Sequence, residues 1–233
     1  DDGTLVYRTD FAANQIVRPS WLDLETGGLV EIAAPGEYIA PKISPDGRTL
    51  AIARLEGFNA RILMFDVATG ASRTFGPGGA RETPAGFDPT GTVFTWNRWD
   101  AGRFSVLRQP LDGSAAPETL ATAGHGIAIN VISRDAALGL LIDYGPGGAW
   151  DLYRVDLTEP GYPWTPHATG QLVQVGHDIS PDGRWILHGQ SISATVRESS
   201  LSAADDPPRH HRTPPPHARP PAPEPPAPPV HEP

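Results

Sequence analysis

A turn motif that returns at a near-constant interval most limits how this chain can fold. Residues 43–48 read Ile-Ser-Pro-Asp-Gly-Arg, and the same six residues recur at 179–184. Two weaker copies lie between them, Phe-Asp-Pro-Thr-Gly at 87–91 and Ile-Ser-Arg-Asp-Ala at 132–136. Successive copies are 44, 45 and 47 residues apart, counted from Ser44, Asp88, Ser133 and Ser180. A period of this length predicts a chain built from stacked structural repeats.

A second turn signal and a run of β-prone residues complete each period. The second turn has the form Asp-x-x-Thr-Gly at 23–27 and 66–70, and weaker forms lie at 110–113 and 155–157. The β-prone runs lie at 4–8, 49–54, 92–97, 138–143 and 185–189. Such turns use the fixed φ of proline, the capping side chains of Ser and Asp, and the positive φ of glycine. We therefore assign to turns, and not to catalysis, the residues Asp46, Asp66, Asp156 and Asp182. Two hairpins per period predict four strands per repeat.

Repeats of this size predict a propeller. A four-stranded sheet cannot bury both of its faces alone, and β-propellers solve this problem by stacking such sheets around an axis. Gly and Pro interrupt nearly every window, so no stretch supports a long helix. We predict an all-β chain: an incomplete β-propeller of four-stranded antiparallel blades, with about four to five blades in residues 1–190. The blades are expected near 1–32, 38–76, 83–120, 127–168 and 173–190. An open ring would leave an exposed strand edge.

The repeat resembles that of the TolB-like β-propellers, relatives of the WD-type propellers, which centres on Ser-Pro-Asp-Gly-x-x-Ile-Ala. The matching segments are 44–51 and 180–187 for this motif, and 62–66 and 152–156 for the third strand that follows it. The resemblance covers residues 1 to about 189, and it implies the fold without implying an activity. In the fourth blade Arg134 and Ala136 replace the proline and the glycine, so a tight turn is not predicted there.

The composition argues against several classes of function. With 18 Lys and Arg against 27 Asp and Glu, the chain has a formal net charge of −9 and offers no basic patch for nucleic acid. It has no cysteine for a disulfide or a thiolate metal site. It also lacks an apolar run of the ~18 residues that a membrane span needs. Neither a Gly-x-Ser-x-Gly elbow nor the loops of a kinase occur. We expect no catalytic residue, cofactor, metal site, nucleic-acid partner or membrane segment in this chain.

The C-terminal part differs from the repeats. Of the 27 prolines in the chain, 13 lie in residues 207–233. Such a segment forms extended polyproline or no fixed structure, so we predict a disordered Pro-rich tail at 191–233. Three explanations stay open: an envelope spacer, a ligand for proline-binding domains, or out-of-frame translation of a GC-rich gene. The third is favoured because the break falls inside a blade. The histidines of this segment are too sparse to predict a metal-binding tract.

Charged loop residues are the candidates for a binding site. The resemblance implies that the turns between first and second strands lie on one face of the propeller. The loops between second and third strands, and those that lead from one blade to the next, are expected on the other face. The charged residues expected on that second face, around the mouth of the central channel, are Glu37, Arg81, Glu82, Arg98, Asp100, His125 and Asp143. They are interpreted either as a surface that binds a partner or as solvated loop residues. His177 is interpreted as a polar channel residue or as a hydrogen-bonded structural histidine.

The tryptophans allow two interpretations as well. They form either an aromatic binding surface or packing between blades, and they are Trp96, Trp99, Trp150, Trp164 and Trp185. Packing is the simpler explanation for Trp150 and Trp185, because both fall in expected strands.

These features favour a non-enzymatic scaffold for protein interaction or ligand sensing, with a protein or peptide as partner. The alternative is the regulatory or sensor propeller of a larger enzyme whose catalytic domain lies outside this segment. The resemblance implies two such enzymes, bacterial serine/threonine protein kinases and prolyl-oligopeptidase-like peptidases. Pro-Gly-Glu-Tyr at 35–38 is similar to the kinase-linked kind. A third possibility is a product without function, if the tail is out of frame. By the same resemblance, the bacterial cell envelope, periplasmic or extracytoplasmic, is the expected location.

Overall fold

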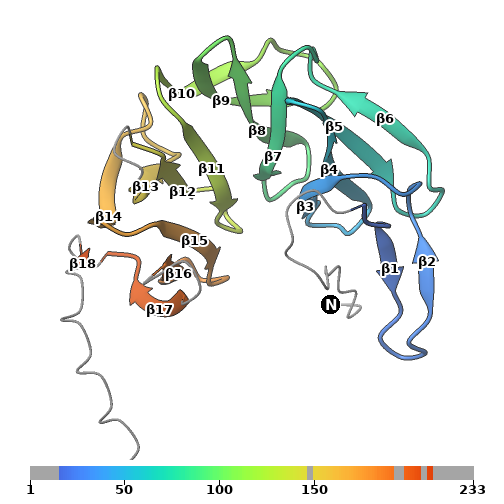
Figure 1. Ribbon diagram of the computed structural model, residues 1–233. Helices are drawn as coiled ribbons and strands as arrows, with labels where there is room; N and C mark the ends of the chain where they lie inside the picture. Colours follow the sequence, from blue (N-terminus) through green and yellow to red (C-terminus); the bar gives the residue numbers. More distant parts are fainter. Residues whose placement is uncertain (1–15, 146–148, 192–196, 206–208, 212–233) are drawn as a thin grey trace, which may run out of the picture.

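The computed structural model describes residues 16–145, 149–191, 197–205 and 209–211. Within these ranges the chain forms eighteen strands and no helix, and it therefore has no helix long and apolar enough to cross a membrane. Figure 1 shows the strands as small sheets that follow one another along an open arc. The predicted fold class, an all-β incomplete propeller, is confirmed. The β-prone run at 4–8 and most of the Pro-rich segment lie outside the described residues.

Three blades have four strands each, and all pairs within a blade are antiparallel. The second blade comprises β3 (Tyr38–Ile43), β4 (Thr49–Glu56), β5 (Asn59–Asp66) and β6 (Ser72–Phe75). The third comprises β7 (Arg81–Phe87), β8 (Val93–Asp100), β9 (Arg103–Pro110) and β10 (Glu118–Ala123). The fourth comprises β11 (Ile127–Ile132), β12 (Leu138–Asp143), β13 (Asp151–Asp156) and β14 (Trp164–Gly170). The described part of the first blade is the hairpin of β1 (Ser20–Leu22) and β2 (Leu29–Glu31).

The fifth blade extends past the boundary predicted at residue 190. It comprises β15 (Gln174–Ile179), β16 (Trp185–Ser191) and β17 (Arg197–Ala203). Because β17 pairs with β16 along its whole length, the prediction that the tail begins at 191 was wrong for this segment. The sequence did not predict β17 because it lacks the aspartate that ends the third strand of two other blades. Ala203 occupies the position of Asp66 and Asp156. A short strand, β18 (Arg209–His211), pairs in parallel with β14.

The first turn of each of three blades is closed by the Ser and Asp side chains of the motif. In the second blade the Ser44 hydroxyl donates to the Asp46 carboxylate at 2.6 Å and accepts from the Thr49 amide at 2.9 Å. The fourth and fifth blades repeat both contacts around Ser133 and Ser180. The sequence motif therefore marks the point at which the chain reverses between the first two strands.

The fourth blade keeps its tight turn although the sequence did not predict it. Ala136 adopts a φ of 56°, close to the 71° of Gly47 in the second blade. Positive φ costs an alanine about 1 kcal/mol relative to glycine. We expect Ala136→Gly to raise the free energy of unfolding by about 1 kcal/mol in urea denaturation. The neighbouring substitution Ala137→Gly should lower it, and a gain in both variants would contradict the explanation.

The turn carboxylates make stability depend on pH. Hydrogen bonds from Ser180, and then from Arg184, lower the pKa of Asp182 to about 2 from an ordinary value of 3.8. A depressed pKa in the folded state contributes stability above the unfolded pKa and loses it as the pH falls through the folded value. We expect the free energy of unfolding to fall between about pH 4 and pH 2, and to fall less steeply in Asp182→Asn and Ser180→Ala. An unchanged slope in both variants would contradict this assignment.

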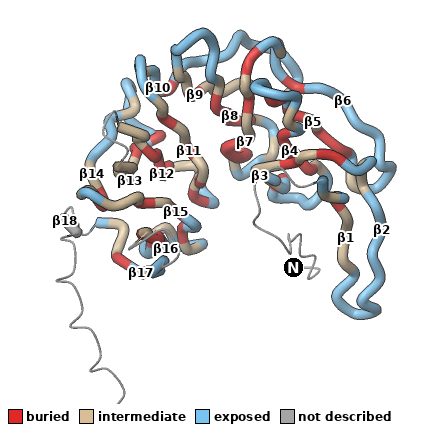
Figure 2. The backbone as a smooth tube through the Cα atoms, in the orientation of Figure 1, coloured by how far each residue is buried: buried red, intermediate tan, exposed pale blue. Residues whose placement is uncertain are grey.

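The hydrophobic core consists of four clusters, one between each pair of neighbouring blades. Figure 2 shows the buried residues along the strands and the exposed ones at the turns and along the outer strands. Between the second and third blades, Phe75 meets Phe94 and Trp96 edge-on, with ring centroids 5.1 and 5.0 Å apart. Each blade is thus stabilised mainly by its neighbours, as expected for a repeat protein.

The last described blade has an exposed apolar face. Leu187 and Leu201 are paired across β16 and β17 and are 39% and 61% exposed, and Trp185 is 44% exposed. The equivalent residues of the second blade, Ala51 and Met64, are buried against the third blade. Packing between blades was the preferred explanation for Trp185, but the structure leaves this side chain 44% exposed on the face of the last described blade.

The inner strands of blades two to five each carry a bulge at the same level. The register shifts lie between Ile39 and Lys42, Pro84 and Gly86, Ile129 and Val131, and Gly176 and Asp178. The Asn97 side chain binds both the N–H and the C=O of Ile129 at 2.8 Å, so the third blade clamps the bulge of the fourth. Bulges bend strands and turn side chains in new directions. They therefore shape the inner wall of the arc, where His177 is exposed at its own bulge.

Candidate functional site

The inner strands of three blades enclose a hollow of about 540 Å³. Figure 1 shows β3, β7 and β11 on the inner side of the arc. These strands supply Ile39, Arg81, Thr83 and Ile127, among others. The second strand β8 adds Arg98 and Trp99, and the residues just before β11 and just after β12 add Gly126 and Tyr144. Two of the seven charged candidate residues, Arg81 and Arg98, therefore line this hollow.

A buried carboxylate holds Arg98 in place. The guanidinium of Arg98 lies 2.6 Å from Glu82, which has no exposed surface, and 2.8 Å from Asp100. It also donates to the carbonyl of Gly78 at 3.2 Å. Burial opposes a charge on Arg98, but hydrogen bonds to Asp100 and Glu82 outweigh it and raise the pKa of Arg98. Three candidate residues, Glu82, Arg98 and Asp100, thus form one network of charge-assisted hydrogen bonds.

The loop before β7 leaves room for that network. Gly76 has a φ of 84°, and a side chain placed there would come within 3.0 Å of the Glu82 carboxylate. Positive φ is strained for residues other than glycine, so both the backbone and the space favour glycine here. The Gly-Pro-Gly-Gly sequence at 76–79 therefore shapes the wall against which Glu82 and Arg98 are held.

The remaining candidates are only partly brought together. His125 Nε2 and Asp143 Oδ1 lie 2.9 Å apart, on residues that directly adjoin Gly126 and Tyr144 of the hollow. Glu37 does not occur among the described residues that line the hollow; its carbonyl accepts a hydrogen bond from the Leu55 amide at 2.8 Å. The structure therefore groups Arg81, Glu82, Arg98 and Asp100, places His125 and Asp143 beside them, and leaves Glu37 apart.

Aromatic residues that were not among the charged candidates complete the surface. Trp99 stacks on Phe104 with ring centroids 5.2 Å apart and an interplanar angle of 9°. Trp99 is 42% exposed and Phe58 is 93% exposed. Burial raises the pKa of Tyr144, which lines the same hollow, and so keeps it neutral. Trp99 is one of the tryptophans named from the sequence as a possible aromatic binding surface, and it lies beside Arg98 near the end of β8.

A smaller hollow of about 190 Å³ lies on the other side of Trp99. Phe58, Gly79, Asp100 and Gly102 contribute to its wall. Arg81 and Trp99 line both hollows and face each other in register on β7 and β8. The two hollows therefore share one wall, and we call these two residues the Arg81–Trp99 ridge.

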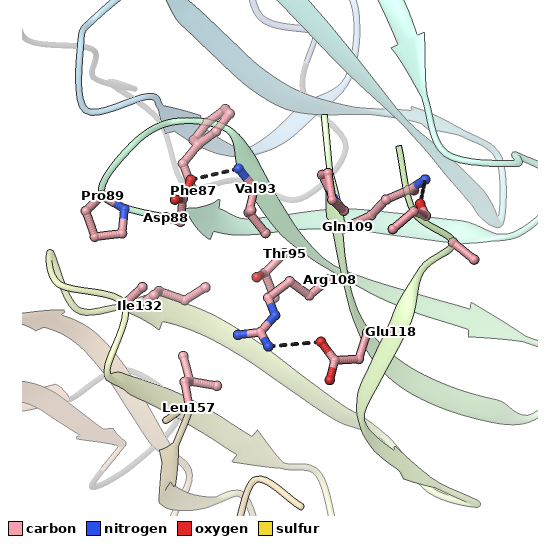
Figure 3. Close-up of a pocket in the computed structure, with 14 residues that line it drawn as sticks. Phe87, Asp88, Pro89, Val93, Thr95, Arg108, Gln109, Glu118, Ile132 and Leu157 are labelled. Carbon is pink, nitrogen blue, oxygen red and sulfur yellow. Dashed lines mark hydrogen bonds and ion pairs between the residues drawn. The ribbon is translucent and has the colours of Figure 1, made fainter. Parts of the chain in front are cut away.

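A third hollow, of about 520 Å³, lies between blades three and four (Figure 3). Its wall includes Asp88 and Ala136, which belong to turns between first and second strands. Figure 3 shows Arg108 directed to Glu118, at 2.9 Å. Arg108 also donates to the Tyr162 hydroxyl at 2.8 Å, and hydrogen bonds from Tyr162 and Arg108 lower the pKa of Glu118. These polar groups satisfy one another across two blades, which indicates a structural role.

The surface around the larger hollow, the channel-mouth surface, carries polar side chains beside exposed aromatic ones. Its polar groups are guanidinium, amide, hydroxyl, imidazole and carboxylate groups, and the carboxylates of Glu82, Asp100 and Asp143 lie 2.6 to 2.9 Å from Arg98 or His125. Among the residues that the structure describes, no group of three or more His, Cys, Asp or Glu is placed to hold a metal ion. Arginine with exposed aromatic side chains is the composition of sites that dominate protein interfaces.

Comparison with solved structures identifies the fold. TolB from Acinetobacter baumannii superposes with a TM-score of 0.66 and 16% identity, over 80% of this chain and 46% of that one. A putative TolB from Agrobacterium tumefaciens gives 0.53 and 15%, over 78% and 85%. One of two prolyl endopeptidases gives 0.62 and 14%, over 86% and 33%. The chain has the TolB-like β-propeller fold and spans about half the length of the Acinetobacter protein. Neither a protein-family model nor a curated protein sequence matches it.

Proposed function

We propose that this propeller is a non-enzymatic scaffold that binds a protein or peptide partner at the channel mouth of blades two to four. The observation that carries the proposal is the Arg81–Trp99 ridge, where a guanidinium and a 42% exposed indole separate two adjoining hollows. The ion pair of buried Glu82 with Arg98 is next to this ridge in the register of β7 and β8. A preformed surface on rigid strands loses little entropy when a partner binds.

Selection of a displayed random-peptide library on the immobilised protein tests the site. We expect enriched peptides to bind Trp99→Ala more than tenfold more weakly than the wild type, because an exposed tryptophan at the centre of an interface dominates affinity. Trp164→Ala is the matched control, since Trp164 is 38% exposed on the outer strand β14. Equal binding to the wild type and Trp99→Ala would show that the peptides bind elsewhere.

A second function is favoured by the coverage of the comparisons. This chain corresponds to 33% of the length of the prolyl endopeptidase. A propeller of this kind can serve as the regulatory or sensor domain of a larger enzyme, a bacterial serine/threonine kinase or a prolyl-oligopeptidase-like peptidase. Reading the gene on both sides of this segment tests the idea. A catalytic domain in the same frame is the expected result, and blades alone would contradict it.

The resemblance to TolB-like propellers also favours the cell envelope as the location of the protein. Fractionation of cells that express the complete gene should place the protein in the periplasmic or membrane fraction. Recovery in the cytosolic fraction alone would contradict this proposal.

A further inference from the structure

The larger hollow carries positive charge in an acidic chain. Its described lining contains two arginines, Arg81 and Arg98, and no carboxylate. Arg98 is paired with two carboxylates, Glu82 at 2.6 Å and Asp100 at 2.8 Å, which more than offset its charge. Arg81 forms no ion pair with any residue that the structure describes. Arg81 therefore presents a positive charge to the hollow in a chain whose formal net charge is −9.

The surroundings of Arg81 make its charge available to a ligand. It lies on β7 opposite Trp99 of β8, and it is half-buried between the two hollows. An arginine prefers a planar carboxylate, to which it can donate two parallel hydrogen bonds. Partial burial strengthens such a pair relative to one in bulk water. A carboxylate on the ligand would therefore supply the ion pair that Arg81 does not form with any residue in the described part of the chain.

The shape of the surface favours an extended ligand over a compact one. The hollows of about 540 and 190 Å³ share the two ridge residues, so a ligand that fills both contacts the ridge between them. Trp99 and Phe104 offer apolar surface on one side, and Phe58 does so on the other. In an extended peptide, neighbouring side chains are only ~3.4 Å apart along the chain and point in alternate directions. An acidic residue of such a segment can rest on the ridge while the residues two positions before and after it, which point the same way, place apolar side chains in the hollows.

We infer that the partner contributes an extended acidic peptide segment, in which an Asp or Glu pairs with Arg81 between two apolar side chains. The inference rests on the proposed binding function and adds the chemistry of the partner. It assigns Arg81 to charge recognition and Trp99 to apolar contact. The Glu82–Arg98 pair, next to Arg81 and Trp99 in the register of β7 and β8, is assigned the role of positioning them.

Isosteric peptide pairs provide the test. Each peptide enriched on the wild type is synthesised with its Asp or Glu and again with Asn or Gln, and both forms are measured by fluorescence anisotropy. We expect the amide form to bind the wild type about tenfold more weakly, because a charge-assisted pair is lost. The Arg81→Gln variant should bind the two forms equally. The matched control Arg73→Gln, an exposed arginine on the outer strand β6, should keep the wild-type preference.

The possible results separate this inference from the proposed function. Peptides that lose binding to Trp99→Ala but bind equally well as acid and amide would overturn the acidic-peptide inference and leave the binding site standing. No enrichment of any peptide on the wild type would overturn both. Displacement of the peptide by free glutamate at the same concentration would identify a small carboxylate as the occupant and would also overturn the inference. Because the acid and amide peptides are compared on the wild-type protein, that comparison does not depend on how the variants fold.

Discussion

Replacing Glu82 by alanine is expected to lower the free energy of unfolding by about 3 kcal/mol, because breaking a buried ion pair on one side strands the other charge. Glu82 has no exposed surface, and the side chain of Arg98 is 19% exposed. Without the carboxylate, Arg98 keeps only its contacts to Asp100 and to the carbonyl of Gly78. The loss can be measured by urea denaturation of the two proteins.

Asp100→Ala is the matched control for this substitution. Asp100 pairs with the same guanidinium, at 2.8 Å, but its side chain is 54% exposed. Exposed ion pairs contribute at most about 1 kcal/mol, so this variant should lose less than that. Equal losses of unfolding free energy in the two variants would show that burial of the carboxylate does not matter. They would also contradict the role of Glu82 as the support of Arg98.

The repeat could be predicted from the sequence because its turns depend on interactions between residues close together in the chain. Ser44 and Asp46 are two residues apart, and their hydrogen bond forms wherever the same residues meet the same backbone geometry. Ser180 and Asp182 repeat it with the same 2.6 Å distance. Short-range signals of this kind do not depend on the rest of the molecule. The number of strands per repeat and the stacking of blades followed from them.

The strand that was missed depends on long-range pairing instead. β17 consists of Arg-Glu-Ser-Ser-Leu-Ser-Ala, in which only Leu201 is a large apolar residue, and that residue is 61% exposed. Its seven pairs with β16 are backbone contacts, which need no particular side chains. Strand preference reflects the surface on which a residue packs more than the residue itself. A sequence pattern therefore could not mark where this blade continued.

The candidate surface was predicted in part for a related reason. Charged residues in loops between blades were recognised as a group, and four of them form one cluster. Which of them face solvent depends on distant residues: Glu82 is fully buried, whereas Arg81 lines two hollows. Phe58 was not identified, because a turn with Gly-Phe carries no repeat signal. Only the burial of each side chain and the distances between them distinguish a supporting residue such as Glu82 from a proposed recognition residue such as Arg81.

Trp96→Ala is expected to lower the free energy of unfolding by about 4 kcal/mol, because it empties the interface between blades two and three. Trp96 is fully buried and meets Phe75 edge-on at 5.0 Å. Its indole N–H has no hydrogen-bond partner among the described residues, so Trp96→Phe should lose less than about 1.5 kcal/mol. Trp99→Ala, at a 42% exposed position three residues along the same strand, should lose less still. Urea denaturation of the three variants measures the order. If Trp96→Ala were as mild as Trp99→Ala, the blades would not be held together by the clusters between them.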